Sequence, residues 1–263
     1  MYICTNIYTH IHMKKIYSFI NHKGGVGKTT STVNVGAGLS ILNKKVLLID
    51  LDPQANLTNN VGLSPNESKN IYGALRGEYP LPIIRTANGL DVVCSTLDLS
   101  GAELELNNEP GRESILKRLI NPVMQDYDFV FIDCPPSLGL LTLNALTASQ
   151  ACIIPVELSN FALVGMTKLF EVIAKVRERI NPELDNYNIL ITRTDKRQAV
   201  HKELAEYLSN EFKGNIFNSE IRHNVKILES QIQRTDIFSY DKTSNGANDY
   251  LAFCNEFLET YKN

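Results

Sequence analysis

The 263-residue sequence has few cysteines, no long apolar run and little net charge, and each shortage excludes a class of protein. No apolar segment approaches the roughly 18 residues that span a bilayer, so the chain is expected to be soluble. The five cysteines are scattered and form no C-x-x-C pair, which argues against a disulfide framework or structural zinc and fits a cytoplasmic setting. The net charge of −3 gives no global reason to expect nucleic-acid binding, although it leaves room for a local basic face.

The start of the chain, MYICTNIYTHIH, does not resemble a secretory signal. It lacks the charged start, the continuous apolar stretch and the small-residue cleavage site of such a signal. Met13 leads through two lysines directly into the strand-like run IYSFI. We therefore expect one folded domain over residues 13 to 263. Residues 1 to 12 are expected to be a disordered extension, or to arise from an upstream start codon.

Strand-like and helix-like segments alternate along the rest of the chain. Short apolar runs predict strands over residues 15–20, 45–50, 128–133, 151–156 and 187–192. Segments of helical length lie between them, as at 29–43 and 166–180. This alternation predicts a single α/β domain whose mainly parallel, doubly wound sheet carries helices on both faces. The stretch 56–108, rich in Gly, Pro and Asn, is expected to be an irregular part of this domain with a short strand over 89–95.

The stretch FINHKGGVGKTTST over residues 19–32 has the character of a phosphate-binding loop. It lies between a predicted strand and a predicted helix, where backbone N–H groups converge on an anion and the helix N-terminus adds positive potential. His22 stands where the pattern G-x-x-x-x-G-K-[ST] has its first glycine, so the later glycines must supply the turns. A glycine-rich turn capped by threonine is the alternative. We predict that nucleotide is bound by Lys23, Gly24, Gly25, Val26, Gly27, Lys28, Thr29 and Thr30.

Three aspartates end predicted strands, in LLIDLDPQ and FVFIDCPP: Asp50, Asp52 and Asp133. Because the carboxyl ends of parallel strands line the ligand crevice, these acids should converge near the phosphates. A lone aspartate at a strand end more often caps a helix or turn, but three beside a phosphate loop favour a site. We place Mg²⁺ at Thr29, Asp50 and Asp133, with Asp133 acting through water or Thr29. One acid after the second strand is expected to orient the attacking water.

The motifs KGGVGKTT, LLIDLDPQAN and FVFIDCPPSLGLLTLNAL together resemble those of the deviant Walker A ATPases, specifically the ParA/Soj partition group of the MinD/ParA superfamily. The similarity continues through IPVELSNFALVGM and, more loosely, IRHNVKILES. The resemblance implies a Mg²⁺-dependent ATPase that hydrolyses ATP slowly and forms a sandwich homodimer with the nucleotide at its interface. It further implies non-specific binding of double-stranded DNA, a location on the nucleoid, and a ParB-type centromere-binding partner that stimulates hydrolysis.

The resemblance also assigns roles to individual residues. Lys28 matches the phosphate-binding lysine, and Lys23 matches the signature lysine that crosses to the partner's nucleotide. Asp52 matches the acid needed for hydrolysis, Asp50 its neighbour, and Asp133 the Walker B acid. The catalytic set is therefore Lys23, Lys28 and Asp52. A second positive charge beside the phosphates would stabilise developing charge as an arginine finger does.

The base and DNA contacts rest on a looser match. Where the family usually has Pro-Arg-Asn near the adenine, this chain has Arg222, His223 and Asn224. Arg222 and Asn224 are the predicted base-side contacts, and Arg222 is the departure from the pattern. Lys196, Arg197 and Lys226 are the predicted DNA contacts, with Arg197 at the position where the resemblance places a DNA-contacting arginine. A solvated surface is the alternative, because acidic and basic residues nearly balance in this part of the chain.

Three rival functions share the same loop. A positioning ATPase would carry a protein cargo, and only its partner protein separates it from a DNA partition ATPase. A MinD-type membrane ATPase needs a basic amphipathic C-terminal helix, whereas DYLAFCNEFLETYKN is acidic and suits docking onto the domain, so no stable membrane association is expected. A nitrogenase-type iron protein needs exposed cysteines, and Cys152 lies in a predicted buried strand.

Overall fold

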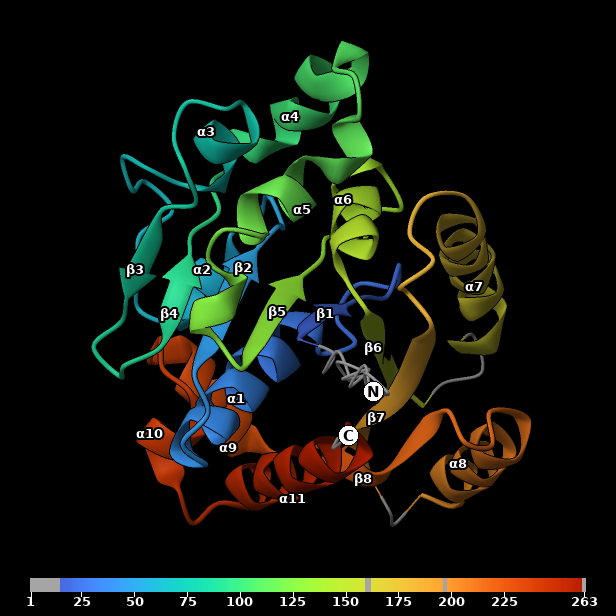
Figure 1. The fold of residues 1–263 in the computed structure, drawn as a ribbon. Helices are drawn as coiled ribbons and strands as arrows, with labels where there is room; N and C mark the ends of the chain where they lie inside the picture. Colours follow the sequence, from blue (N-terminus) through green and yellow to red (C-terminus); the bar gives the residue numbers. More distant parts are fainter. Residues whose placement is uncertain (1–14, 159–161, 196–197, 262–263) are drawn as a thin grey trace, which may run out of the picture.

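One eight-stranded sheet organises the computed structural model, which describes residues 15–158, 162–195 and 198–261 (Figure 1). The strand order is β3-β4-β2-β5-β1-β6-β7-β8, and every neighbouring pair is parallel except β3 and β4. The strands are β1 (Ile16–Phe19), β2 (Val46–Asp50), β3 (Ile83–Arg85), β4 (Asp91–Val93), β5 (Phe129–Asp133), β6 (Ala151–Glu157), β7 (Asn186–Thr194) and β8 (Ile216–Arg222). The expected single α/β domain with a mainly parallel, doubly wound sheet is confirmed.

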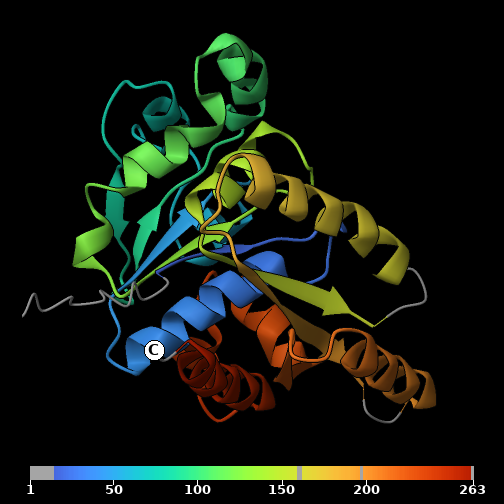
Figure 2. The same ribbon diagram turned by 45° about the vertical axis from the view of Figure 1, so that its right-hand side comes forward.

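Helices cover both faces of this sheet. In Figures 1 and 2, α1, α10 and α11 lie on one face, and α5, α6 and α7 lie on the other. The helices are α1 (Lys28–Ile41), α2 (Asn56–Asn60), α3 (Ile71–Leu75), α4 (Leu99–Glu105), α5 (Ile115–Ile120), α6 (Leu140–Ala148), α7 (Ala162–Arg179), α8 (Ala199–Glu211), α9 (Val225–Ile232), α10 (Ile237–Asp241) and α11 (Asn245–Thr260). Short 3-10 turns lie at Leu106–Asn108, Arg112–Ser114 and Met124–Asp126.

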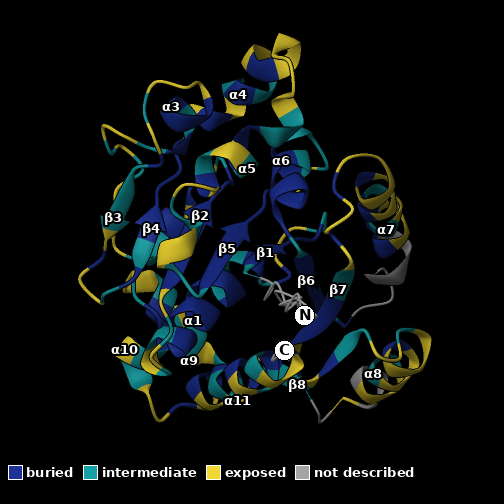
Figure 3. Ribbon diagram, in the orientation of Figure 1, coloured by how far each residue is buried: buried dark blue, intermediate teal, exposed yellow. Residues whose placement is uncertain are grey.

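The alternation of side chains along β1 separates two hydrophobic cores. Ile16 and Ile20 belong to the core on the α5–α7 side, whereas Tyr17 and Phe19 belong to the core under α1 and α11. Successive side chains of a strand point to opposite faces, so a strand that is apolar at every position supplies both layers. Figure 3 shows the central strands as almost entirely buried. The sheet therefore gives the loops at its carboxyl edge a rigid base.

The C-terminal helix α11 packs its apolar face onto the second core. Phe253, Cys254 and Phe257 are buried, and the ring of Phe257 lies 4.9 Å from Tyr17 and 5.3 Å from Phe129, measured between ring centroids. Such edge-to-face contacts add to the stabilisation that burial itself provides. The expectation that this helix docks on the domain is confirmed.

Two edge strands were not expected from the sequence. β3 pairs antiparallel with β4, and β8 extends the sheet beyond β7. In the β8 sequence IFNSEIR only Phe217 and Ile221 are buried, so the strand lacks the continuous apolar run that marks the central strands. The stretch 56–108, expected to be irregular, contains three short helices as well as the β3–β4 hairpin.

Candidate nucleotide-binding site

The phosphate loop joins β1 to α1 and is shaped by two glycines with left-handed backbone. Gly25 and Gly27 have φ of 78° and 89°, a region that residues with a Cβ rarely occupy. Gly27 precedes α1 without a side-chain cap, and the first turn of α1 contains no acidic residue. The free amide groups and the positive end of the helix dipole therefore favour an anion at this point. The turns come from the later glycines, as the position of His22 requires.

Two lysines bracket the loop. The Lys28 side chain folds back across it, with Nζ 3.5 Å from the carbonyl oxygen of Lys23 and only 7% of the residue exposed. Lys23 is half-buried, and its backbone N–H donates to Oδ1 of Asn21 at 3.0 Å. Asn21 in turn donates to the carbonyl oxygen of Pro155 at 2.8 Å, which fastens the start of the loop to β6. Two cationic residues thus lie in one rigid turn.

The strand-end acids converge beside the loop, as expected. Asp50 and Asp133 are register partners on the adjacent strands β2 and β5, and both are fully buried. The Thr29 hydroxyl donates to Oδ2 of Asp133 at 2.6 Å. Burial, together with the negative charge of Asp50, holds the pKa of Asp133 well above its usual value. A cation at this point would relieve the repulsion between the two carboxylates.

Asp50 is held by several donors of the protein. Its Oδ2 accepts bonds from the backbone N–H of Thr58 at 2.8 Å and from the Thr58 hydroxyl at 2.7 Å. Its Oδ1 accepts a bond from the backbone N–H of Asp52 at 3.2 Å. Burial raises the pKa of Asp50 to about 7 despite these donors. The contacts show that Asp50 fixes α2 and the start of the next loop, and its role as a metal ligand stays a prediction.

Asp52 follows β2 and lines a cavity together with the phosphate loop. It is 6% exposed, and its Oδ1 accepts a bond from the backbone N–H of Gln54 at 2.9 Å. Burial raises the pKa of Asp52, while the ammonium group of Lys28 acts in the opposite direction. A buried carboxylate with a raised pKa beside a lysine suits the acceptance of a proton from water.

A cavity of about 530 Å³ brings the predicted residues together. Its lining includes residues of the phosphate loop, Asp52, and the segment between β8 and α9. The predicted site residues among its lining are Gly24, Gly25, Gly27, Lys28, Thr29, Thr30, Asp52, Arg222 and Asn224. One pocket therefore joins the phosphate-binding turn to the predicted base-side residues.

The two predicted base-side residues have structural partners. The guanidinium of Arg222 forms a two-pronged pair with Asp249, with Nε 2.9 Å from Oδ2 and Nη2 2.6 Å from Oδ1. Asn224 is the N-cap of α9, and its Oδ1 accepts a bond from the backbone N–H of Lys226 at 2.8 Å. These contacts give both side chains a local role, and contact with the nucleotide base stays a prediction for each.

Three residues that the sequence did not single out brace the loop. The Thr192 hydroxyl donates to the carbonyl oxygen of Val26 at 2.8 Å, and Arg193 Nη1 donates to that of Gly25 at 3.1 Å. From α9, Gln231 Nε2 donates to the Thr30 hydroxyl at 2.6 Å. Thr192 and Arg193 lie at the carboxyl end of β7. Because the carboxyl ends of parallel strands line the ligand crevice, the reasoning that identified the three aspartates could also have identified these two residues. Nothing in the local sequence marks Gln231.

Of the three predicted DNA contacts, only Lys226 lies among the described residues. Lys196 and Arg197, like the extension over residues 1–12, lie outside the described residues. Lys226 Nζ lies 2.8 Å from a carboxylate oxygen of Glu229 and 5.8 Å from the ring centroid of Tyr240. The bond to Glu229 raises the pKa of Lys226, so the ammonium stays charged but is partly neutralised by its neighbour. A DNA contact by Lys226 stays a prediction.

The described part of the chain contains neither a membrane-spanning helix nor a cluster of metal-binding side chains. None of its helices is long and apolar enough to cross a membrane. Within residues 15–158, 162–195 and 198–261, no group of three or more His, Cys, Asp or Glu side chains is arranged to hold a metal ion.

A glycine-rich turn between a central parallel strand and a helix, with a lysine and a Thr–Asp pair at its end, defines a phosphate-loop nucleotide-binding protein. Residues 14–186 match a family described as an AAA domain. The chain is 40% identical over 248 residues to the sporulation initiation inhibitor protein Soj of Bacillus subtilis, covering 93% of this chain and 98% of Soj. It belongs to the ParA/Soj family of partition ATPases.

Solved structures show the same fold. A crystal structure of cobyrinic acid a,c-diamide synthase from Mycobacterium smegmatis with bound ADP and magnesium has a TM-score of 0.83 and 31% identity, over 95% of this chain and 96% of that one. A putative plasmid partition protein from Borrelia burgdorferi, bound to AMPPNP, has a TM-score of 0.78 and 27% identity, over 94% of this chain and 99% of that one. The fold thus serves proteins with different names, so function must be argued from the site.

Proposed function

We propose that this chain is a partition ATPase that uses ATP to make and unmake a DNA-bound homodimer. The ATP-bound sandwich dimer binds double-stranded DNA without sequence preference, and a ParB-type partner releases it by stimulating slow, Mg²⁺-dependent hydrolysis. The observation that carries the proposal is the pair of lysines in one phosphate loop, Lys28 buried against the carbonyl oxygen of Lys23. One lysine suffices to bind phosphate within a chain, and the second serves the nucleotide of a partner.

The cavity fits ATP and Mg²⁺. Its volume of about 530 Å³ lies in the range of roughly 300–1,000 Å³ typical of small-molecule pockets. The uncapped turn of α1 and Lys28 supply donors for phosphate oxygens, and Thr29 with its partner Asp133 would hold the ion. The ion would neutralise charge on the phosphates. The Mycobacterium smegmatis and Borrelia burgdorferi relatives were crystallised with ADP and magnesium and with AMPPNP, respectively.

The remaining acids divide into two roles. Asp52 lines the cavity and would orient the attacking water and accept its proton. Asp50 bonds to Thr58 and to the backbone of Asp52, so it would position Asp52 in addition to its predicted role as a metal ligand. Lys23 would reach the phosphates bound by the partner chain, where it stabilises charge that develops during hydrolysis.

Two observations favour this proposal over rival functions. The apolar face of α11 is buried against the domain, so this helix is not the exposed amphipathic helix that a MinD-type membrane ATPase uses. A cluster-bridging iron protein would need exposed cysteines, and the four described cysteines, Cys94, Cys134, Cys152 and Cys254, are all buried. A positioning ATPase for a protein cargo would use the same site, and its partner protein decides between that function and DNA partition.

DNA binding tests the proposal directly. Fluorescence anisotropy of two labelled duplexes of unrelated sequence would be measured with ATP, with ADP and without nucleotide. We expect both duplexes to bind only with ATP, and affinity to fall steeply as salt rises, because phosphate contacts release counterions. Equal binding with ATP and ADP, or binding of only one duplex, would contradict the proposed cycle.

A further inference from the structure

Two helices that are far apart in the sequence line the nucleotide cavity. α2 contributes Asn56 and Asn60, and α9 contributes Val225, Leu228 and Gln231. The separation of α2 and α9 therefore influences how closely the cavity encloses a nucleotide. The contacts that hold these two helices together bear on how fast a nucleotide is released.

Arg234 joins the ends of these two helices. It follows α9, and its guanidinium donates from Nε to the carbonyl oxygen of Asn59 at 3.1 Å and from Nη2 to the carbonyl oxygen of Leu63. Nη2 also lies 3.5 Å from Oδ1 of Asn59, which belongs to α2. The two segments are in close contact here, because a Cβ added at Gly62 would lie 3.4 Å from the carbonyl oxygen of Arg234. We call the bonds of Arg234 to Asn59 and Leu63 the Arg234 bridge.

The backbone of Arg234 is in the left-handed region, with φ of 55°. It lies just after the end of α9, where the N–H of Thr235 donates to the carbonyl oxygen of Ser230 at 3.0 Å. Glycine is the usual residue at such a position, because a Cβ is disfavoured there. A side chain in this conformation persists only where its surroundings hold it, and the Arg234 bridge supplies that hold. An arginine at this point therefore favours a role for its side chain beyond ending the helix.

We infer that Arg234 is a positioning residue that holds α2 and α9 together and slows the release of bound nucleotide. The inference rests on the proposed function, in which the cavity binds ATP and ADP. Arg234 is not among the lining residues of the cavity, so it acts through the two helices. α2 is also held by Asp50, which accepts bonds from the N–H and the hydroxyl of Thr58. For α2 and α9 to separate, the Arg234 bridge must break, and release then follows.

The release rate of a fluorescent ADP analogue tests the inference. The full chain, loaded with the analogue and Mg²⁺, would be mixed with excess unlabelled ADP in a stopped-flow instrument. Arg234→Gly removes the guanidinium and permits the left-handed backbone, so the melting temperature of the free protein should stay close to that of the wild type. Release should be about tenfold faster, because the bond of a charged donor no longer has to break first. Release within about twofold of the wild-type rate would overturn the inference.

Two further variants separate the Arg234 bridge from other effects of the substitution. Arg234→Lys keeps the positive charge but not the planar fork, so its release rate should lie between those of the wild type and Arg234→Gly. Asn43→Gly is the matched backbone control, because Asn43 follows α1 with φ of 62° and does not line the nucleotide cavity. It should release the analogue at the wild-type rate. Equal acceleration in Asn43→Gly would show that a glycine after any helix changes release, and would refute the Arg234 bridge.

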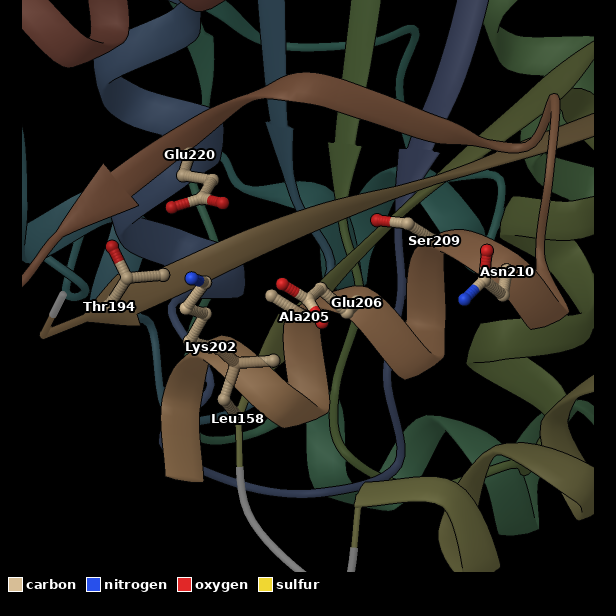
Figure 4. A pocket seen from close by; sticks show the side chains of 8 residues that line it. All are labelled: Leu158, Thr194, Lys202, Ala205, Glu206, Ser209, Asn210 and Glu220. Atoms are coloured by element: carbon tan, nitrogen blue, oxygen red, sulfur yellow. The ribbon is translucent and has the colours of Figure 1, made fainter. Parts of the chain in front are cut away.

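A second cavity, of about 570 Å³, allows the position of the nucleotide to be checked (Figure 4). Its lining includes Lys202 and Glu206 of α8 and Glu220 of β8, and it shares no lining residue with the nucleotide cavity. The two carboxylates among its described lining make it a poor site for phosphates. Lys202→Ala should therefore leave the affinity for the analogue and its release rate unchanged. Weaker binding by Lys202→Ala would place the analogue in the second cavity and overturn the inference.

The outcomes also separate this inference from the proposed function. If the wild type did not bind the ADP analogue at all, the proposed function would fail, and the Arg234 bridge would fail with it. If the wild type bound the analogue and Arg234→Gly released it at the wild-type rate, only the Arg234 bridge would be refuted.

Discussion

Loss of the Lys28 ammonium group should abolish nucleotide binding at physiological concentrations. The group is buried at the phosphate turn, where the only hydrogen bond of Nζ to a described residue is the long one to the Lys23 carbonyl. It is therefore available for phosphate oxygens. A charge-assisted hydrogen bond contributes about 1.5–3 kcal/mol, so two such bonds contribute about 3–6 kcal/mol, or roughly 10²- to 10⁴-fold in affinity.

A fluorescent ADP analogue provides the assay, with the dissociation constant of Lys28→Ala compared with that of the wild type. Lys45→Ala is the matched control, because Lys45 is exposed and precedes β2, at the amino end of the sheet. Its affinity should equal that of the wild type. An affinity of Lys28→Ala within fivefold of the wild type, in a protein that is folded by circular dichroism, would show that the phosphates bind elsewhere.

Further variants test the roles of Asp52, Arg193 and Phe257. Asp52→Ala should still bind ATP and form dimers but hydrolyse no ATP, so filter binding should show it trapped on DNA; normal turnover would contradict the role of Asp52. Arg193→Ala loses the bond to the Gly25 carbonyl and should weaken ADP binding about fivefold. Arg193→Gly loses the same bond but relieves the left-handed backbone, so urea denaturation should find it about 1 kcal/mol more stable than Arg193→Ala. Phe257→Ala removes a fully buried ring and should lower the free energy of unfolding by about 3–5 kcal/mol, and a loss below about 1 kcal/mol would contradict the packing of α11.

The parts of the site that depend on parallel strand geometry were predictable from the sequence. Asp50 and Asp133 end apolar runs of similar length, and parallel pairing of β2 with β5 brings them into register. The Thr29–Asp133 bond follows, because the phosphate loop starts from β1, which pairs with β5. The apolar runs, together with the rule that the carboxyl ends of parallel strands converge, were sufficient to predict the positions of these residues.

The parts that depend on pairing between distant segments were not predictable. Gln231 and Thr30 are separated by 201 residues, and no periodicity in the sequence indicates that a side chain of α9 bonds to the first turn of α1. The sequence match of Asn224 to a nucleotide-binding motif did not reveal its local role. Its side-chain oxygen caps the N-terminus of α9. β8 was missed because an edge strand is buried at only part of its length.

The central claim is that Lys23 makes the ATP site a property of two chains. Multi-angle light scattering of the wild type and of Lys23→Ala, each with ATP and Mg²⁺ and with ADP, measures this most directly. We expect a wild-type dimer with ATP and a monomer with ADP, and a Lys23→Ala protein that binds ATP but stays monomeric. A Lys23→Ala protein that dimerises with ATP as the wild type does would contradict the claim.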